Sequence, residues 1–406
     1  MSGRLARGGR VVAALLAAVA CQTAPARAAG PLPDSTTHAT GVVTWAASAD
    51  LMGEGTAGQG YRLIVHTSVG GSDLRVRFTN AFGDRPLTLA GVHAGLRETG
   101  AALRPGSNRP VTFGGVPTVT VPAGAAAWSD PLPGRWPAGA DLVVSLRTPD
   151  AAGPASGHWM AMQTSYTGGG DHTAEESGAA WTRTTGSWWY LDAVSVRPAG
   201  RATGAVVALG DSITDGWQST TDLNRRWPDY LARRLGTLGT PIRGVANEGI
   251  SGNKILADGA GQSALHRLDR DVLSQPGVRT LFLFESVNDI KAHTGVTAAD
   301  LAAGYREIAR RAHAAGMCVV AATIAPFKGW PEWDPAAEAV RQDVNRFLRG
   351  SGDFDAVTDF DRILRSPYDP TRILPFLDGG DHLHPNDKGM QALADAVGTG
   401  SLDCGR

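Results

Sequence analysis

The hydrophobic pattern of this 406-residue chain changes near residue 200, and this change constrains the fold more than any other feature. From about Val42 to Val196, apolar and polar residues alternate with period two, as in Leu74, Val76 and Phe78. Clusters of Gly, Pro, Asn and Asp separate these segments, and no helical period of useful length appears. The first part is therefore predicted to be an all-β sandwich or jelly-roll-like domain of half-buried strands.

Beyond a linker at Arg197 to Gly204, short apolar strands alternate with segments of helical period. Trp227, Leu231, Leu235 and Leu238, for example, have the spacing of one helical face. Strands that are apolar on both faces and separated by helices predict a parallel sheet covered by helices on each side. The expected strands are Ala205 to Leu209, Ile242 to Ala246, Thr280 to Phe284, Cys318 to Thr323 and Ala356 to Phe360.

The length of the chain exceeds the size at which one hydrophobic core usually keeps growing, so two domains are expected. Three arginines precede an apolar run at residues 11–20, and residues 26–28 read Ala-Arg-Ala, which predicts a signal peptide at 1–28. The apolar run is about ten residues, half of what a membrane-spanning helix needs. We expect a β domain at 29–200, a second domain at 201–406, and a secreted, extracellular protein.

Charge and cysteine content limit the binding partners and the redox compartment that can be expected for this protein. The chain has a formal net charge of −1, and loss of the four arginines in residues 1–28 would leave −5. A mildly acidic protein has no broad attraction to nucleic acid or anionic membranes. Two cysteines would remain, Cys318 and Cys404, and an exported pair could form a disulfide or stay as buried thiols. The sequence leaves these two alternatives open.

A candidate nucleophile follows the first strand of the second part, in the run Gly-Asp-Ser-Ile-Thr-Asp-Gly at 210–216. Ser212 would lie between a strand end and a helix start, where its hydroxyl can face a cleft and helix amides can stabilise negative charge. A serine at this position could also be an ordinary helix N-cap. The loop has neither G-x-G-x-x-G nor G-K-[ST], so no nucleotide site is predicted.

A candidate base lies near the other end of the second part, in Asp-His-Leu-His-Pro-Asn at 381–386. A serine nucleophile needs such a base, and histidine, with an ordinary pKa of about 6.5, suits that role near neutral pH. Asp381 could orient the imidazole of His384. Either histidine alone could be a solvated loop residue. No third ligand accompanies His382 and His384 at a recognisable spacing, so no metal site is predicted.

Two further polar loops each follow an expected strand, at residues 247–253 and 285–289. An acyl transfer needs hydrogen-bond donors aimed at the developing oxyanion, and a glycine amide and an asparagine side chain are suitable donors. In a parallel α/β sheet, the loops at the carboxyl ends of the strands gather at one edge. Four polar loops at such positions therefore predict a single active site.

With these four blocks, the stretch from Ala205 to about Val397 resembles the SGNH/GDSL hydrolases, the GDSL-like lipase/acylhydrolase family. A β-rich domain ahead of the hydrolase is similar to exported actinobacterial members. The resemblance implies a flavodoxin-like three-layer α/β/α domain with Ser212 as nucleophile and with His384 and Asp381 completing a triad. It also implies an oxyanion hole formed by the Ser212 amide, the Gly252 amide and the Asn288 side chain.

One position departs from the family pattern. The third block usually reads G-x-N-D, and Ser286 replaces its glycine. If that position needs a positive φ, serine costs about 1 kcal/mol and could displace Asn288. Ser286→Gly would then raise turnover about three- to tenfold. The rival interpretation is that the Ser286 hydroxyl binds substrate or braces the loop.

Together these features predict an extracellular serine esterase or acylhydrolase that cleaves carbohydrate acyl esters or short-chain lipid or aryl esters. The ester is the expected partner, without nucleic acid, stable membrane insertion, metal or cofactor, and the protein is expected to be a monomer. One alternative is a noncatalytic carbohydrate-binding protein with a degenerate hydrolase domain. Seven of the eleven tryptophans lie in the β-rich part, although core packing is the favoured explanation for them. Another is a glycoside hydrolase that uses two of Asp211, Asp215 and Glu285.

Overall fold

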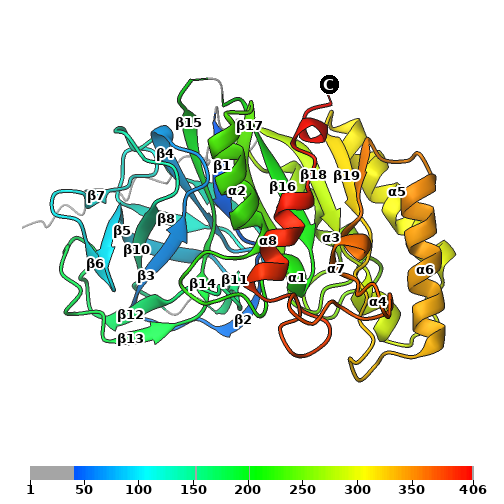
Figure 1. Cartoon of the computed structure of the whole chain (residues 1–406). Coiled ribbons are helices and arrows are strands. Elements are labelled where there is room, and N and C mark those ends of the chain that lie inside the picture. The colour runs from blue at the N-terminus through cyan, green and yellow to red at the C-terminus, as the bar shows by residue number, and fades with distance from the viewer. Residues whose placement is uncertain (1–40, 151–152, 201, 405–406) are drawn as a thin grey trace, which may run out of the picture. The chain divides into compact units, whose positions relative to one another are not determined.

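The computed structural model describes residues 41–150, 153–200 and 202–404 (Figure 1). All of them belong to one compact unit, His38–Arg406. The predicted signal peptide at 1–28 lies outside the described residues. The predicted boundary between 200 and 201 falls between strands β15 (Leu191–Pro198) and β16 (Gly204–Gly210). The structure does not divide the compact unit at this position, so the boundary between two domains stays a prediction.

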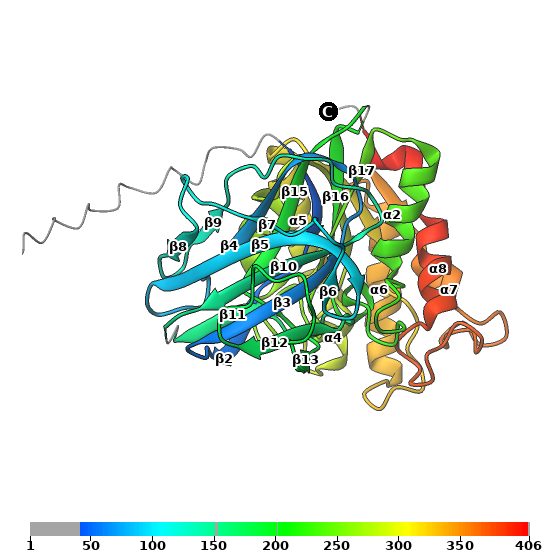
Figure 2. The ribbon, with the colours of Figure 1, turned by 90° about the vertical axis from the view of Figure 1, so that its left-hand side faces the viewer.

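The first part is built of antiparallel strands, as predicted, in three sheets (Figure 2). The first sheet has the order β1-β15-β4-β9, with β1 at Val42–Ala46, β4 at Gly71–Thr79 and β9 at Ala126–Trp128. The second has the order β13-β12-β3-β10-β5-β6, with β7 and β8 also paired to β5, and the third has the order β14-β11-β2. Their bounds are β2 (Asp50–Glu54), β3 (Gln59–His66), β5 (Leu87–Thr99), β6 (Ala102–Leu103), β7 (Arg109–Pro110), β8 (Thr118–Val121), β10 (Asp141–Thr148), β11 (Pro154–His158), β12 (Ser165–Gly169), β13 (Arg183–Thr185) and β14 (Trp188–Trp189). Apolar side chains of the two larger sheets, such as Phe78 and Leu146, share one core.

The outward faces of these strands are more buried than simple alternation predicts. Arg77, which the pattern of β4 places opposite the core, is buried and pairs with Asp192 at 2.9 Å. Its guanidinium also donates to the hydroxyl of Ser274, in the second part of the chain, at 3.1 Å. Val43 of β1 likewise donates from its backbone to the carbonyl of Pro276 at 2.9 Å. The expectation of half-buried strands is therefore wrong for β1 and most of β15, which the second part covers, whereas β9 and the first half of β4 keep half-buried or exposed residues.

The second part contains the predicted parallel sheet, in the order β17-β16-β18-β19-β20. Its other strands are β17 (Ile242–Gly249), β18 (Val278–Phe284), β19 (Cys318–Ala322) and β20 (Ala356–Thr358). In chain order this is 2-1-3-4-5, the order of flavodoxin-like sheets, with the switch point between β16 and β18. All five expected strands exist. However, β17 runs on to Gly249, and Phe360 begins a helix instead of ending a strand.

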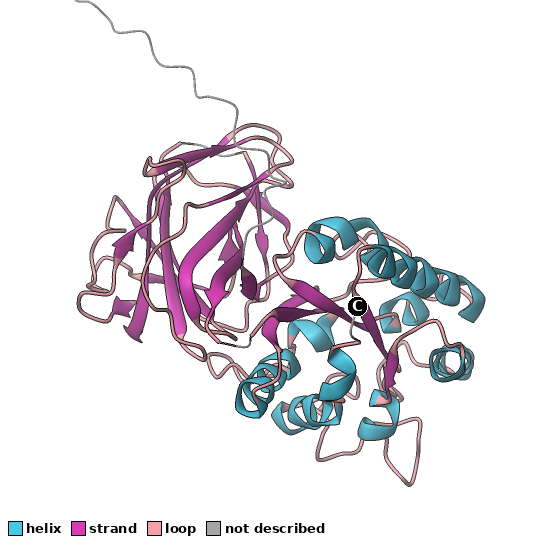
Figure 3. Ribbon diagram, turned by 90° about the horizontal axis from the view of Figure 1, so that it is seen from above, coloured by secondary structure: helices cyan, strands magenta, loops and turns pink. Residues whose placement is uncertain are grey.

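Alternate residues of the parallel strands face different helices, and Figure 3 shows helices on both sides of the sheet. Val206 and Phe282 share a core with α2 (Trp227–Leu238) and α8 (Asp387–Ala396), whereas Val207 and Leu283 share one with α5 (Ala298–Ala314) and α6 (Pro335–Gly350). The shorter helices are α1 (Ser212–Asp215), α3 (Ala264–Leu268), α4 (Val287–Lys291) and α7 (Phe360–Leu364), with single π and 3₁₀ turns at Asp269–Leu273 and Thr399–Leu402. None of the helices in the described ranges is long and apolar enough to cross a membrane.

Helix α2 follows its predicted face up to its last residue. Trp227, Leu231 and Leu235 are buried, but Leu238 is 55% exposed. The helix ends there because Gly239 adopts a left-handed conformation. The predicted helical face is thus buried along α2 except at Leu238, where the helix ends.

The cysteine question is settled by a disulfide between Cys318 and Cys404. Cys318 is the first residue of β19, so the bond lies at the amino end of that strand. This is the opposite end from the loops that carry the predicted site. The bond joins the C-terminal segment to the sheet.

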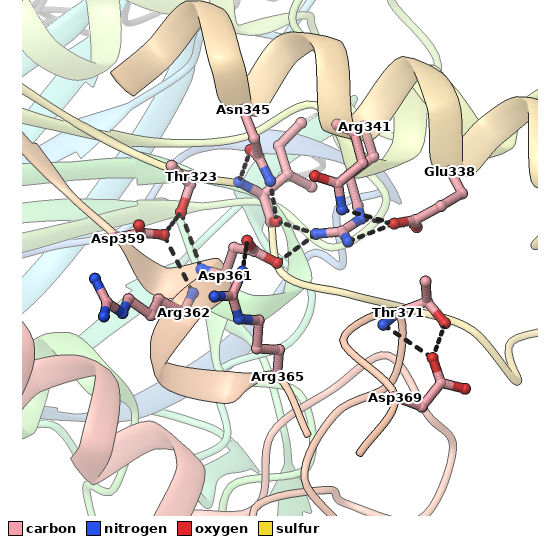
Figure 4. Close-up of polar contacts among 12 residues, drawn as sticks. Thr323, Glu338, Arg341, Asn345, Asp359, Asp361, Arg362, Arg365, Asp369 and Thr371 are labelled. Carbon is pink, nitrogen blue, oxygen red and sulfur yellow. Dashed lines mark hydrogen bonds and ion pairs between the residues drawn. The ribbon is translucent and has the colours of Figure 1, made fainter. Parts of the chain in front are cut away.

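An ion-pair network joins α6 to α7 beyond the carboxyl ends of β19 and β20 (Figure 4). Asp361, fully buried, accepts hydrogen bonds from Arg341 and Arg349 at 2.7 Å each and from Arg365 at 3.3 Å. Its backbone N–H donates to the hydroxyl of Thr323 at 2.9 Å. The buried carboxylate is thus neutralised by several partners, which fixes the loops that follow both strands.

The tryptophans of the β-rich part mostly serve packing. Four of the seven are buried, two are half-buried and one is exposed: Trp45, Trp136, Trp181 and Trp188, then Trp128 and Trp189, then Trp159. This agrees with the favoured packing explanation. It leaves no row of exposed indole faces among the described residues of this part.

Candidate active site

Ser212 lies at a sharp turn from strand to helix at the centre of the parallel sheet. The last residue of β16, Gly210, pairs with Gly249 of β17 on one side and with Phe284 of β18 on the other. Asp211 caps the short helix α1 by accepting from the N–H of Ile213 at 2.9 Å. As the first residue of α1, Ser212 has an N–H without an intrahelical acceptor. Because these three strand ends are paired with one another, the three predicted loops that follow them begin side by side at one edge of the sheet.

The structure brings Ser212, His384 and Asp381 together. The Ser212 hydroxyl oxygen lies 2.8 Å from Nε2 of His384, and Nδ1 of His384 lies 2.7 Å from a carboxylate oxygen of Asp381. The other oxygen of Asp381 accepts the backbone N–H groups of Leu383 and His384, at 3.0 and 2.9 Å. The loop geometry thus fixes the carboxylate, which in turn fixes the imidazole with Nε2 toward the serine.

The surroundings set the charge states of this chain of hydrogen bonds. Burial lowers the pKa of His384 below its ordinary value, although the charge and hydrogen bond of Asp381 oppose the shift, and nearby Lys291 lowers it further. Burial alone would raise the pKa of Asp381, but the hydrogen bonds from His384 and Leu383 lower it overall. At neutral pH the carboxyl group is ionised and the imidazole is free to accept a proton.

The second histidine of this block has a different environment. His382 is about half exposed, and its Nδ1 lies 2.7 Å from Asp378. Its backbone φ is positive, at 69°, and its side chain contacts Asp378, whereas that of His384 contacts Ser212. Across the described ranges, no group of three or more His, Cys, Asp or Glu side chains could hold a metal ion.

The two predicted oxyanion donors lie on loops that are tied together. Gly252 has a φ of 82°, and its N–H meets no hydrogen-bond acceptor in the described part of the chain. Asn288, in α4, uses one N–H of its side chain to donate to the carbonyl of Asn253 at 2.8 Å, which leaves the other N–H. Asp289 accepts from the backbone N–H of Ile255 at 2.9 Å. The third block is thus held against the loop that carries Gly252.

Ser286 adopts a conformation that favours glycine. Its φ is 99° and its ψ is −17°. The position therefore has the positive φ on which the strain interpretation depends. Its fully buried hydroxyl donates to the hydroxyl of Tyr305 at 2.9 Å, and Tyr305 donates to the carbonyl of Glu285 at 2.8 Å. The serine therefore bears backbone strain and braces the loop at the same time.

Aromatic side chains and one cation surround His384, and the sequence patterns did not single them out. The ring centroids of Trp330 and Trp217 lie 5.7 and 6.3 Å from that of His384. The ammonium group of Lys291 lies 4.9 Å from the ring centroid of Trp330. Trp217 directly follows the run at 210–216 and Lys291 ends α4, but Trp330 lies in a segment without a motif, so the proximity of the three could not be derived from spacing.

The carboxyl groups that a glycosidase would need do not face open solvent. Asp211, Asp215 and Glu285 are all buried. Asp211 caps α1, and Glu285, whose carboxyl oxygens accept no hydrogen bond from the described residues, lies 4.0 Å from Arg267. Burial raises the pKa of both acids, that of Asp211 to about 7. Two carboxyl groups that flank a bound glycosidic bond would have to face the cleft, so this geometry disfavours the glycosidase alternative.

Several solved structures resemble part of the chain. A GDSL-like lipase from Bacteroides thetaiotaomicron is 18% identical, with a TM-score of 0.40 over 50% of this chain and 89% of its own. The native aryl esterase of M. smegmatis is 18% identical, with a TM-score of 0.40 over 48% and 95% of the two chains. A carbohydrate acetylesterase from Sinorhizobium meliloti is 19% identical, with a TM-score of 0.37 over 48% and 95%. The search of curated proteins gave no match.

The second part of the chain makes this protein an ester hydrolase. Residues 208–392 match the GDSL-like Lipase/Acylhydrolase family, so the second part of the chain contains a domain of that family. The matched region contains all of the predicted site residues, from Ser212 to His384. The resemblance seen in the sequence is thereby confirmed.

Proposed function

We propose that the protein is a serine esterase in which Ser212 is the nucleophile, His384 the general base and Asp381 the residue that orients it. The observation that carries the proposal is the unbroken chain of hydrogen bonds from the Ser212 hydroxyl through His384 to Asp381, at 2.8 and 2.7 Å. A buried imidazole with a lowered pKa supports it, because the base must be neutral to accept a proton.

In the first half of the reaction, the Ser212 oxygen attacks the ester carbonyl while Nε2 of His384 takes the hydroxyl proton. The carbonyl oxygen becomes an oxyanion, for which the N–H groups of Ser212 and Gly252 and the free N–H of the Asn288 side chain are the donors. The carbon–oxygen bond to the alcohol then breaks, and His384 returns the proton to the leaving alkoxide. An acyl group remains on Ser212.

In the second half, a water molecule takes the place of the alcohol. His384 removes a proton from the water as it attacks the acyl carbon, and the oxyanion forms against the same donors. The bond to the Ser212 oxygen breaks and the serine regains its proton from His384. Asp381 stays ionised throughout and stabilises the imidazolium that forms twice per cycle.

The decisive experiment compares the wild-type protein with Ser212→Ala. We expect the wild type to hydrolyse p-nitrophenyl acetate and to be labelled by a fluorophosphonate probe, which requires an activated serine. The variant should lose both properties while circular dichroism shows an unchanged fold, since the change removes one buried oxygen. A noncatalytic carbohydrate-binding protein would show neither activity nor labelling in the wild type.

For the substrate we propose carbohydrate acyl esters or short-chain lipid or aryl esters. The indole groups of Trp217 and Trp330 beside His384 support this, since indole surfaces pack well against a sugar ring, an aryl group or a short acyl chain. Activity against p-nitrophenyl esters of increasing chain length, acetylated xylan and phospholipid distinguishes these classes. A preference for long-chain phospholipid would contradict the proposal.

We further propose that the enzyme is exported and works outside the cell. We also propose that its hydrolase part has a flavodoxin-like three-layer α/β/α fold. The Cys318–Cys404 disulfide supports export, because such bonds persist mainly in oxidising compartments. The strand order 2-1-3-4-5 supports the scaffold. Fractionation of expressing cells, with activity measured in the medium, tests the location.

A further inference from the structure

A histidine of the β-rich part contacts the helix that carries Ser212. His158 is the last residue of β11, and its Nε2 lies 2.9 Å from a carboxylate oxygen of Asp215, the last residue of α1. Both side chains are buried, with 6% and 4% of their surface exposed. A buried pair of this kind, between segments distant in the sequence, is costly unless it is satisfied by further partners.

The partners of His158 define its charge. Nδ1 faces the carbonyl oxygen of Ser48 at 3.0 Å, and Nε2 faces the carbonyl oxygen of Met160 at 3.2 Å in addition to Asp215. The two carbonyl oxygens can only accept, and Asp215 likewise only accepts when it is ionised. A neutral imidazole would therefore direct a lone pair at one of these oxygens, whereas an imidazolium donates from both nitrogens. These contacts therefore favour the imidazolium form of His158.

The other charged groups around the imidazole are already paired. His158 and Asp215 line a small cavity together with Arg226, Asp229 and His66. Arg226 contacts Asp229 at 2.6 Å, and His66 contacts Asp141 at 2.8 Å. This leaves Asp215 as the counter-ion of His158. Burial lowers the pKa of His158, but the charge and hydrogen bond of Asp215 outweigh burial and raise it overall.

The second oxygen of Asp215 holds the loop that carries Gly252. It accepts the backbone N–H of Ser251 at 2.9 Å and the Ser251 hydroxyl at 2.8 Å. The start of the same loop is pressed against α1, because a side chain at Gly249 would clash with the backbone of Asp215. The carboxylate therefore connects His158 on one side to the residue directly before Gly252 on the other.

We propose that His158 is a positioning residue through which the β-rich part holds the oxyanion site of the hydrolase part. As an imidazolium it fixes the carboxylate of Asp215, and Asp215 in turn fixes the amides of Ser251 and Gly252. The inference rests on the proposed function, since it assigns the Gly252 amide to the oxyanion. It gives the β-rich part a direct role in the chemistry of the other part.

Two substitutions separate the two hydrogen bonds of the imidazole. In His158→Asn the amide nitrogen replaces Nδ1 and can still donate to Ser48, but the donor that Nε2 supplies to one oxygen of Asp215 is lost. In His158→Gln the amide nitrogen reaches the place of Nε2 and can donate to Asp215. The matched control is His172→Asn, because His172 is an exposed histidine of the same part that contacts Glu175.

The expected result is a loss of turnover with little change in KM. Removal of one oxyanion donor costs about 10²- to 10³-fold in kcat, and a donor that is loosened should cost less, so we expect His158→Asn to lower kcat on p-nitrophenyl acetate about 10- to 100-fold. KM should stay within about twofold, because the interaction forms in the transition state. His158→Gln should be intermediate, and His172→Asn should match the wild type.

Hydrogen–deuterium exchange of the peptide around residues 249–253 gives a readout that does not depend on activity. Exchange should be faster in His158→Asn, intermediate in His158→Gln and unchanged in His172→Asn. Wild-type kcat or wild-type exchange in His158→Asn would overturn the inference. If that variant does not fold, His158→Gln decides by the same two measurements. Full turnover in Ser212→Ala would instead refute the proposed nucleophile, while the exchange data would still decide the role of His158.

Discussion

At the scale of single residues, the proposed catalytic groups could be singled out from sequence because each lies in a short motif. Ser212 and His384 are 172 positions apart, but each is flanked by its own block of turn-forming residues. His158 carries no such signal. It is an isolated histidine in a β-rich segment, 57 positions from Asp215, and only the packed structure pairs the two. Motifs therefore reveal residues that touch substrate more readily than residues that act through others.

The two histidines near the C-terminus should differ sharply in their effect on turnover. His384→Ala should lower kcat on p-nitrophenyl acetate by several orders of magnitude, because it removes the base that contacts the Ser212 hydroxyl. His382→Ala should lower it about threefold at most, because His382 is about half exposed and its ion-pair partner is Asp378, not Ser212 or Asp381. Steady-state kinetics of the two variants check this. Equal losses would show that the assignment of the base is wrong.

The pH dependence of kcat/KM should reflect the charge of Lys291. Burial and this ammonium group both lower the pKa of His384, so in the wild type the activity should rise with pH below the ordinary histidine value of about 6.5. In Lys291→Met the imidazolium loses a repulsive neighbour, so its pKa should rise and the acid limb should move to higher pH. Lys328→Met is the control, because Lys328 lies over Trp333 and contacts Asp369. A shift to lower pH, or an equal shift in the control, would contradict the argument.

At the scale of elements, the kind of element was easier to predict than its ends. The strands of the parallel sheet are continuous apolar runs, and burial on both faces requires such runs. Their ends depend on details that periodicity does not contain. Gly239 ends α2 and leaves Leu238 exposed, and β17 extends because Asn247 and Glu248 still pair with β16. The loop at Ser286 shows the same limit, since the missing glycine predicted strain but not the partner that compensates it.

Three variants separate strain from bracing in that loop. A left-handed conformation costs a non-glycine residue about 1–2 kcal/mol, and a buried hydrogen bond contributes about 0.5–1.5 kcal/mol. Ser286→Gly relieves the first and loses the second, so stability should change little. Ser286→Ala loses the hydrogen bond and keeps the strain, so it should be destabilised by about 1 kcal/mol. Tyr305→Phe removes both hydroxyl contacts and should lose about as much or more.

Turnover of the same variants bears on the original expectation of a three- to tenfold gain. Because the hydroxyl braces the loop beside Asn288, we now expect kcat of Ser286→Gly to stay within about threefold of the wild type. Thermal unfolding and kinetics on one ester measure both effects. A gain near tenfold would restore the strain interpretation and show that the brace has no part in placing Asn288.

At the scale of the whole molecule, a polar contact region joins the β-rich part to the hydrolase part. Ser48 precedes β2 and is buried against two charged residues of the other part, Glu248 and Arg267. Local patterns did not predict this contact, because each of its residues resembles an ordinary loop or strand residue in its own segment. The change of pattern near residue 200 could reveal two kinds of structure, but not how closely they associate.

The contribution of this contact region to stability can be measured at Ser48. Its hydroxyl donates to a carboxyl oxygen of Glu248 at 2.7 Å and accepts from Arg267 at 2.6 Å. Ser48→Ala removes a partner from two buried groups, and a buried group left unsatisfied costs about 1–3 kcal/mol, so the free energy of unfolding should fall by that amount. Ser72→Ala is the matched control, because the hydroxyl of half-buried Ser72 makes one long contact, to Asp73 at 3.4 Å, within the described residues. It should change stability by about 0.5 kcal/mol at most. Urea unfolding followed by tryptophan fluorescence gives both values.

A single cooperative transition that moves to lower urea in Ser48→Ala alone would show that the two parts unfold together. Two transitions, with only one affected or neither, would show that the parts are stable independently and that the contact region merely holds them side by side.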